Sequence, residues 1–279
     1  MGGGGSVFIA TNNRSHAPLA QKAMEAGKHC LVEKPIATTL DDARRLQQLA
    51  RQRQVSLAVD HMMTENAYNQ RARELVAAGA IGEVNDISLH MEFCYGSTPN
   101  EAATWRCADP LEIGGPVGDV GSHCLYMAEF LLNGTVKSLS CVYTPRTLNI
   151  AVENGAFVHF RLDTGVQGTA QVAFNRPRGG LGGTLTNLGY EIYGTKGSAI
   201  LVEPFEPANA IRLCLEEAAG DYEKGVNMIQ LRQQHRDEAH ELELKSFVAT
   251  IRGEQAPDRP LSHELLVQET LLRATGGVQ

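Results

Sequence analysis

The sequence lacks the features that mark several classes of protein. Its six cysteines include no C-x-x-C pair, which argues against a zinc ribbon or a disulfide framework and fits a reducing cytoplasm. No apolar run approaches the roughly 18 residues of a membrane span, and no signal-peptide pattern precedes the first strand. A net charge of −7 and a pI near 5.7 argue against a nucleic-acid or anionic-membrane surface. We therefore expect a cytoplasmic globular protein that binds neither nucleic acid nor membrane.

Two catalytic motifs are also absent. Residues 118–124 contain no G-x-S-x-G sequence, so a serine hydrolase is not supported. His235 and His240 are five positions apart, unlike the two histidines of a zinc-binding H-E-x-x-H helix. We interpret both histidines as part of a surface helix and expect no metal site.

The glycine-rich start, MGGGGS, does not qualify as a phosphate-binding loop. Such a loop follows a strand and opens a helix, whereas these glycines precede the first strand. We interpret residues 1–6 as a flexible linker or a cloning scar and exclude them from the prediction of the fold.

Short apolar runs alternate with helical patterns in the first part of the chain. Strands are expected at 7–10, 30–32 and 55–59, and helices at 16–26 and 40–53. The second helix has a capping-box-like start, with Thr39 three residues before Asp42. Short, wholly apolar strands separated by helices predict a parallel sheet with helices packed over it.

The pattern changes after Asp60. A helix at 65–78 leads to the segment ISLHMEF, where apolar and polar residues alternate, which predicts an antiparallel strand with one exposed face. Further elements are expected in the order of the sequence: a helix at 119–132, strands near 136–144, 156–163, 167–174, 188–194 and 198–202, and helices at 234–252 and 262–274. This second part is therefore predicted to be an α+β domain with an open sheet.

Two polar segments stand where ligands are usually bound. In an open parallel sheet the ligand lies beyond the carboxyl ends of the strands, and TNNRSH and EKP follow the first and second strands. Proline after Lys34 biases that lysine towards an extended backbone. From these residues alone, a ligand contact and an ordinary surface ion pair between Glu33 and Lys34 remain equally open.

A second constellation lies in the segment GGPVGDVGSH, residues 114–123. Its four glycines allow close approach of the backbone, and Asp119 and His123 are spaced i, i+4 on a predicted helix. An acid and an imidazole on one helix face suit general acid–base chemistry. The alternative is a capped helix with a merely packed histidine.

Taken together and in order, these motifs resemble the Gfo/Idh/MocA family, which includes glucose–fructose oxidoreductase and inositol dehydrogenase. The segments that carry the resemblance are IATNNRSHA, HCLVEKP, AGAIGEV, TWR, GGPVGDVGSH and YEIYGTKGSA. It implies an α/β plus α+β fold class: a partial Rossmann-type parallel sheet, then an open-faced, mainly antiparallel sheet domain with helices. The implied division is 7–61 for the C-terminal half of a Rossmann domain and 62–279 for a substrate-binding and oligomerisation domain.

The resemblance also implies roles for individual residues. Lys34 would hydrogen-bond the substrate hydroxyl, His123 would remove its proton, and Asp119 would position both. The implied cofactor is NAD or NADP, and the cofactor-binding residues would be Thr11, Asn12, His16, Glu33, Lys34, Trp105 and Arg106.

The chain departs from the family pattern at its start. The glycine fingerprint G-x-G-x-x-G and the acid that follows it are absent, so we expect the adenosine-binding half to be missing from this chain. Residues 7–10 would then form an uncovered apolar edge. Losing about 4 kcal/mol of cofactor contacts would weaken binding about a thousandfold.

Three functional hypotheses follow. The first is an NAD(P)-dependent oxidoreductase that oxidises a secondary hydroxyl of a sugar, an inositol or a related polyol, impaired in this truncated chain. The second is a non-catalytic remnant that acts as an oligomerising or binding module. The third is an NAD-dependent glycoside hydrolase of the same family. The resemblance further implies a homo-dimer or homo-tetramer formed through the C-terminal sheet.

Overall fold

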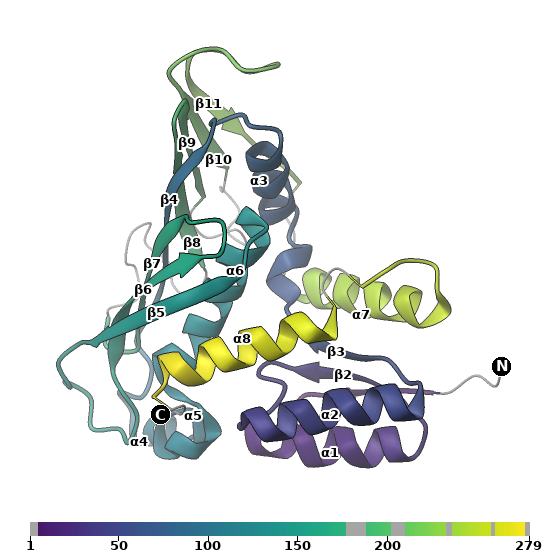
Figure 1. Ribbon diagram of the computed structural model, residues 1–279. Coiled ribbons are helices and arrows are strands. Elements are labelled where there is room, and N and C mark those ends of the chain that lie inside the picture. The colour runs from purple at the N-terminus through teal and green to yellow at the C-terminus, as the bar shows by residue number, and fades with distance from the viewer. Residues whose placement is uncertain (1–4, 177–187, 202–209, 233–235, 258–259, 277–279) are drawn as a thin grey trace.

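The computed structural model describes residues 5–176, 188–201, 210–232, 236–257 and 260–276 of the 279-residue chain. Its strands form a three-stranded sheet and an eight-stranded sheet, which lie side by side and are joined by helices (Figure 1). The cloning-scar prediction falls mostly on residues 1–4, outside the described ranges, and the first strand begins at Ser6.

The smaller sheet is parallel throughout. Its strands, in the spatial order β1-β2-β3, are β1 (Ser6–Ile9), β2 (His29–Glu33) and β3 (Leu57–Asp60). Helices α1 (Asn13–Glu25) and α2 (Leu40–Arg53) pack together below it, and α7 (Arg236–Arg252) lies on its other side (Figure 1). The predicted cap at Thr39 is confirmed, because its hydroxyl accepts the Asp42 N–H at 3.1 Å. The last residue of the buried strand β2 is Glu33, which therefore lies at the carboxyl end of the small sheet.

Strand β1 lies at an edge of this sheet, as the sequence predicts. Within the part of the chain that the structure describes it pairs with β2 alone, in the register Ser6–His29 to Ile9–Val32. Val7 and Phe8 are 37% and 43% exposed. An apolar edge with unpaired backbone groups is a surface on which another strand can pair.

The larger sheet is mixed. Its strands are β4 (Val84–Glu92), β5 (Val136–Tyr143), β6 (Gly155–Leu162), β7 (Gln167–Ala173), β8 (Gly189–Gly194), β9 (Gly197–Leu201), β10 (Ile211–Leu215) and β11 (Gly225–Ile229), in the spatial order β11-β10-β9-β8-β4-β7-β6-β5. The prediction of an antiparallel β4 is wrong for one of its neighbours: β4 runs antiparallel to β8 but parallel to β7. Alternation reports that one face is buried and does not report the direction of the partner strand.

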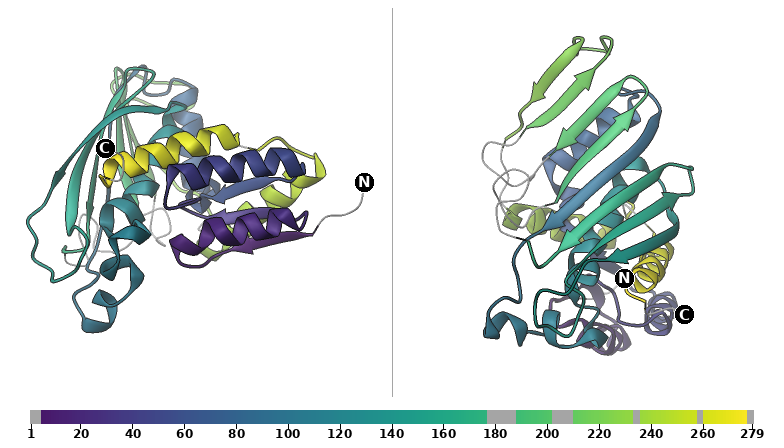
Figure 2. Two further views of the ribbon diagram at one scale, coloured as in Figure 1. Left: turned by 60° about the horizontal axis from the view of Figure 1, so that its bottom comes forward. Right: turned by 90° about the vertical axis from the view of Figure 1, so that its left-hand side faces the viewer.

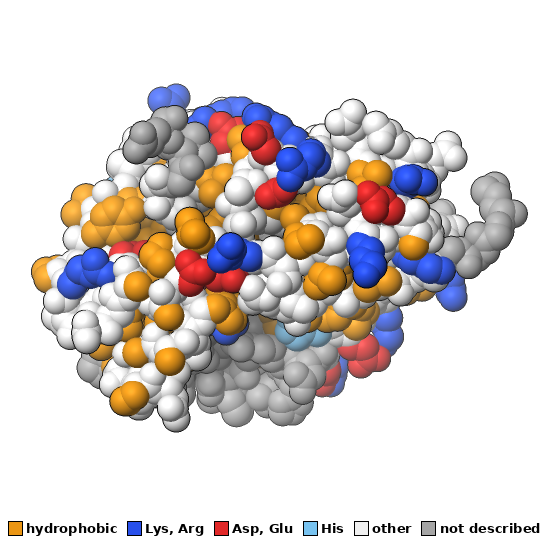
Figure 3. Space-filling view, turned by 90° about the horizontal axis from the view of Figure 1, so that it is seen from below, with side chains coloured by type: hydrophobic (Ala, Val, Ile, Leu, Met, Phe, Trp, Pro, Cys, Tyr) orange, Lys and Arg blue, Asp and Glu red, His pale blue; other side chains and the backbone are white. Residues whose placement is uncertain are grey.

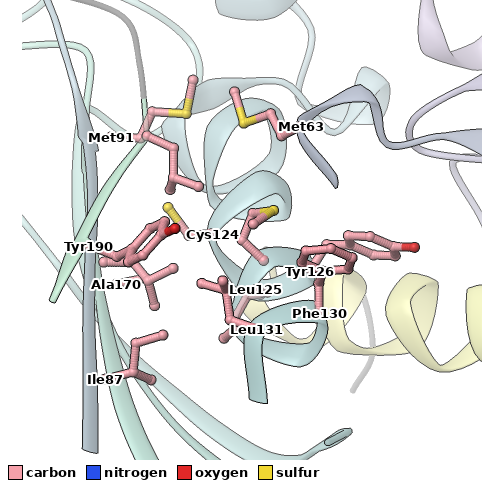
Figure 4. Close-up of a cluster of buried hydrophobic side chains, with 14 of the residues drawn as sticks. Met63, Ile87, Met91, Cys124, Leu125, Tyr126, Phe130, Leu131, Ala170 and Tyr190 are labelled. Carbon is pink, nitrogen blue, oxygen red and sulfur yellow. The ribbon is translucent and has the colours of Figure 1, made fainter. Parts of the chain in front are cut away.

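The core lies between this sheet and the helices that cover one of its faces. Helix α6 (Ser122–Leu132) crosses the sheet, and its side chains meet those of β4, β7 and β8 (Figure 4). Ile87 and Met91 of β4 and Tyr190 of β8 point into this layer, as the predicted alternation requires. Helix α3 (Ala67–Ala77) packs beside α6 and extends the cover.

No helix of the described residues lies on the other face of the large sheet (Figure 2, right). The exposed large hydrophobic residues on this face are Val142, Phe157, Tyr193, Val226 and Met228. Phe157 alternates with the buried Ala156 and Val158, which places it on this open face.

Two C-terminal helices connect the sheets. Helix α8 (Leu261–Ala274) contacts α2 of the parallel part and β5 of the large sheet (Figure 1). His61 approaches Glu264 at 3.1 Å, and His263 approaches Glu129 at 2.8 Å, all four side chains being buried. These buried histidine–glutamate contacts hold α8 against both parts of the molecule.

The sequence pattern missed several elements. Strands β10 and β11 were not predicted, although Ile211, Leu213 and Leu215 alternate with polar residues. Three short helical segments between β4 and α6 were also not predicted: α4 (Pro99–Ala102), α5 (Trp105–Ala108) and η2 (Pro110–Glu112).

No described helix is long and apolar enough to span a membrane. On the face seen from below, acidic and basic side chains lie among one another and do not form one large patch of a single sign (Figure 3).

Candidate active site

A cavity of about 560 Å³ opens at the carboxyl ends of the parallel strands, where the small sheet meets the large one. Its lining comes from the loops after β1 and β2, the end of β3, strand β4, the segment around α5, the start of α6, and α7. The residues that line it are Ala10, Thr11, Asn13, His16, Glu33, Lys34, Asp60, Met62, Met63, Met91, Phe93, Tyr95, Trp105, Arg106, Asp119, Val120, His123 and His240. A second cavity, of about 430 Å³, lies between β3 and the C-terminal helices, and no sequence-predicted site residue lines it.

Lys34 and Arg106 both contact the carboxylate of Asp119. The Lys34 Nζ lies 3.1 Å from Asp119 Oδ1 and also donates to the Asp119 carbonyl oxygen. The Arg106 Nε lies 3.1 Å from Asp119 Oδ2. The side chains of Lys34 and Asp119 are 11% and 14% exposed, so this ion pair is largely shielded from water.

The charges around Asp119 set its protonation. Burial by itself would raise the pKa of the Asp119 carboxyl, but the charges and hydrogen bonds of Lys34 and Arg106 outweigh burial and lower the pKa. Asp119 is therefore a carboxylate throughout the neutral range, and it holds the Lys34 ammonium at the wall of the cavity.

A π-helical turn, η3 (Val117–Gly121), leads into α6 and presents Asp119 and His123 to the same cavity. The sequence predicted one helix over 119–132; the structure has this wider turn before α6 begins at Ser122. Gly118 is required here, because a Cβ atom would collide with the carbonyl group of Ile113. Gly121 has no such neighbour, the nearest atom to its imagined Cβ being 3.6 Å away.

The TWR segment lines the cavity, and η2, which follows it, is held against the start of α1. Arg106 stacks on the ring of Trp105 at 4.2 Å, and both line the cavity. Glu112, which is 4% exposed, accepts hydrogen bonds from the Asn12 amide at 2.6 Å and the Arg14 N–H at 2.8 Å. A carboxylate at the N-terminus of α1 is favoured by the helix dipole.

The predicted cofactor-binding residues do not all lie in the same place. Thr11, Glu33 and the ring of His16 line the cavity. Asn12 does not; its amide is directed at Glu112, while Asn13 takes the place beside the cavity. The cofactor-binding role of Asn12 stays a prediction.

His16 connects the two loops that follow β1 and β2. Its ring is fully buried, with Nδ1 2.8 Å from the Pro35 carbonyl oxygen and Nε2 3.2 Å from that of Thr11. These contacts fix the backbone on both sides of the cavity floor, so His16 helps to shape the cavity as well as line it.

Three site residues were missed by the sequence. Asp60 ends β3 as Glu33 ends β2, and that shared position was a readable signal. The interpretation of His240 as a surface residue is wrong, because its Nδ1 lies 3.2 Å from Asp60 Oδ2 in the cavity wall; His235 lies outside the described residues. Glu112 had no signal, since its partners are about 100 residues away along the chain.

Two family models match the chain. One, described as an oxidoreductase family with an NAD-binding Rossmann fold, matches residues 5–61, and the other, a GFO/IDH/MocA C-terminal domain, matches residues 69–200. Together the matches span more than half of the chain. The chain belongs to the Gfo/Idh/MocA oxidoreductase family. The resemblance seen in the motifs is thereby confirmed, and so is the fold class.

Relatives in the family act on sugars. The 1,5-anhydro-D-fructose reductase of Ensifer adhaerens is 26% identical over 254 residues, covering 90% of this chain and 71% of that enzyme. The dTDP-3,4-didehydro-2,6-dideoxy-alpha-D-glucose 3-reductase of Streptomyces violaceoruber is 30% identical over 202 residues, covering 72% of this chain and 55% of that enzyme. This chain thus spans between about half and three quarters of the length of these family members.

The solved structure of levoglucosan dehydrogenase with NADH and levoglucosan shares the fold. It superposes with a TM-score of 0.81 at 19% identity and covers 97% of this chain and 78% of that one. The model that matches the N-terminal part of the chain is thus that of an oxidoreductase family with an NAD-binding Rossmann fold. The comparisons do not favour the non-catalytic or glycoside-hydrolase alternatives.

Proposed function

We propose that this chain takes part in NAD(P)-dependent oxidation of a secondary hydroxyl group of a sugar or related polyol, or in the reverse reduction. One observation carries the proposal: Lys34, which follows β2, Asp119 of η3 and His123 of α6 line one cavity at the carboxyl end of the parallel sheet. Ligands of open α/β sheets bind at this end of the strands.

The cavity fits the nicotinamide end of such a cofactor. Its volume lies within the range of about 300–1,000 Å³ usual for small-molecule sites. Thr11, Glu33 and Lys34 would lie on the sheet side of the cofactor, and Trp105 and Arg106 on the other. When bound, the cofactor would supply the acceptor or donor of a hydride.

The residues of the chain would handle the proton and the charge. The His123 imidazole would accept the proton of the substrate hydroxyl as a general base. The Lys34 ammonium would hydrogen-bond the same oxygen and stabilise the negative charge that develops on it. Asp119 would position the ammonium, because it already holds Nζ at 3.1 Å in a largely buried pair.

The lining also suits a small polyhydroxylated substrate. Carboxylate, ammonium, guanidinium and imidazole groups surround the cavity, and the Met62, Met63 and Met91 side chains supply an apolar wall. Such a mixture offers many hydrogen bonds to hydroxyl groups and apolar contact to the C–H face of a sugar ring. The named substrates of the relatives support the sugar class, with an inositol as the further candidate.

We further propose that the open face of the large sheet forms a homo-dimer or homo-tetramer contact. The support is the exposed apolar set on that face, which includes Phe157, Tyr193 and Val226. Light scattering coupled to gel filtration would test it: the chain should elute as a dimer or tetramer, and Phe157→Lys should shift it towards the monomer. A monomer at all concentrations contradicts this part of the proposal.

The first test of the function uses the sole tryptophan. Trp105 lines the cavity, so energy transfer from Trp105 to bound NADH or NADPH reports occupancy. We expect sensitised cofactor emission that saturates on titration, together with a rise in the melting temperature. Trp105→Phe should abolish the transfer. The absence of both signals up to millimolar cofactor contradicts cofactor binding by this chain.

A further inference from the structure

A carboxylate–imidazole cluster lies in the cavity beside the residues assigned to the proposed reaction. Glu33 and Asp60 are the last residues of β2 and β3, and the parallel register pairs them directly. Neighbouring residues in register point to the same side of a sheet, so both carboxylates face the same space. His240 reaches this space from α7, the helix that covers the face of the small sheet opposite α1 and α2.

The donor atoms are close enough to share one ion. His240 Nδ1 lies 3.2 Å from Asp60 Oδ2, and ligand atoms of all three residues lie within 4.8 Å of one another. Ligand atoms bound to zinc at about 2.0–2.2 Å in a tetrahedral site are separated by about 3.4 Å. The His240–Asp60 distance of 3.2 Å is close to this value, and rotation of the half-buried Glu33 side chain would bring in the third ligand.

The local charge favours a cation. Asp60 is 2% exposed and the Glu33 side chain is partly buried, so the two neighbouring carboxyl groups are largely shielded from water. The adjacent Lys34 ammonium is engaged by Asp119 at 3.1 Å. Two carboxylates therefore share a partly buried space in which a bound divalent cation would relieve their repulsion.

We propose that Glu33, Asp60 and His240 form a binding site for one divalent transition-metal ion. An imidazole nitrogen among the ligands favours ions such as Zn²⁺, Co²⁺ or Ni²⁺ over Mg²⁺ and Ca²⁺, which prefer oxygen ligands alone. Three protein ligands leave a coordination position directed into the cavity, as in open metal sites.

Backbone hydrogen bonds fix the orientation of both carboxylates in the cluster. The Met62 N–H donates to Asp60 Oδ1 at 3.0 Å, and the Lys34 N–H donates to Glu33 Oε2 at 3.1 Å. Each carboxylate thus has one oxygen held by the backbone, and the second Asp60 oxygen contacts His240 Nδ1, a contact that a metal ion bound between them would replace. Groups of this kind orient ligands and raise metal affinity.

Calorimetric titration with Zn²⁺ tests the proposal. The purified chain, freed of metal by a chelator and then dialysed, should bind one equivalent. His240→Ala removes a half-exposed ligand and should lower the affinity at least about tenfold, the smallest effect expected even for an outer-shell partner. His159→Ala, an exposed histidine on the open face of the large sheet, is the matched control and should bind as the unaltered chain does. Unchanged zinc binding in His240→Ala overturns the site.

Co²⁺ gives a reading that needs no variant. The visible d–d bands of cobalt in the unaltered chain should be those of nitrogen and oxygen ligands, because the three proposed ligands include no sulfur. Intense thiolate-to-cobalt absorption without such bands would place the metal on cysteines and overturn the proposal. No stoichiometric binding of either metal would also overturn it and leave His240 and Asp60 as an ion pair between α7 and β3.

Discussion

The Lys34 ammonium and the Asp119 carboxylate, 85 positions apart in the sequence, meet at 3.1 Å in a nearly buried ion pair. Lys34 enters from the end of β2, and Asp119 from the π-helical turn before α6. The pair joins the parallel sheet to the helix that forms the core of the larger domain. Because both ends are rigid, the ammonium has a defined position in the cavity.

Replacing Lys34 by methionine should remove the charge that stabilises the reacting oxygen. The expected fall in kcat is about 10²–10³-fold, the cost of losing one donor from an oxyanion site. The measurement is steady-state turnover with the sugar that gives the highest rate in a screen with NAD⁺ and NADP⁺. Lys137→Met, an exposed lysine on β5, is the control and should retain full activity. Turnover of Lys34→Met close to that of the control would refute the role given to Lys34.

Replacing His123 by asparagine should remove the general base while keeping a polar side chain of similar size. We expect kcat to fall about 10²–10⁴-fold, because proton transfer by a positioned base contributes that much. The pH profile of kcat/KM should also lose its rise with pH, which a merely structural histidine would not cause. His29→Asn lies outside the cavity and serves as the control. A retained pH rise in His123→Asn would assign the base to another group.

A methyl group at Gly118 should disturb the active site, whereas one at Gly121 should not. The Cβ of Gly118→Ala would meet the Ile113 carbonyl group, so the turn that presents Asp119 must shift. Misplacing a catalytic group by about 1 Å can cost about 10²-fold in rate. Gly121→Ala, three residues away in the same turn, meets only ordinary contacts and is the matched control. Equal turnover and melting temperature in the two variants would show that the turn tolerates the methyl group.

The raised pKa of Glu33 predicts a pH-dependent gain in stability for Glu33→Gln. Burial and the Asp60 charge keep the proton on folded Glu33 to a higher pH than on the unfolded chain. The native state thus binds more protons than the unfolded state, and its stability falls as pH rises from the ordinary pKa through the raised one. Glutamine avoids this loss, so the variant should melt at a higher temperature than the unaltered chain at pH 7.

That difference should shrink as the pH is lowered towards the ordinary glutamate pKa, where Glu33 is protonated in both states. Melting curves from pH 4 to pH 8 in the presence of a chelator are the measurement. Glu83→Gln, an exposed glutamate, should show no comparable trend and is the control. A Glu33→Gln variant less stable than the unaltered chain at pH 7 would contradict the electrostatic account.

Much of the fold could be predicted because its signals are local. The alternation at Ile87, Leu89 and Met91 indicates a half-buried strand whichever strands lie beside it. Thr39 indicates a helix start because its hydroxyl accepts a hydrogen bond from the backbone N–H of Asp42, three residues later. The parallel neighbour of β4 could not be predicted, since residue alternation is the same in both directions of pairing. Strand β10 also has a local signal, since its buried residues Ile211, Leu213 and Leu215 alternate with less buried ones.

The candidate site was predictable in part for the same reason. Lys34 and His123 stand in motifs at the end of a strand and the start of a helix, where ligands are commonly bound, and both line the cavity. Asn12 stands in such a motif too, yet its amide turns to Glu112, because the segment around α5 folds back over the start of α1. A motif indicates which backbone position lies at the site and leaves the direction of the side chain undecided.

The amino-acid sequence by itself determined the succession of strands and helices, the buried faces and the motifs that resemble the family, because periodicity, caps and strand-end residues act over a few positions. Only the tertiary structure decided that Asp119 is shared by Lys34 and Arg106, and that His240 meets Asp60 across 180 residues of chain. These contacts depend on how α7, η3 and the two sheets pack, and packing is set by the summed burial of the whole core, which no local pattern encodes.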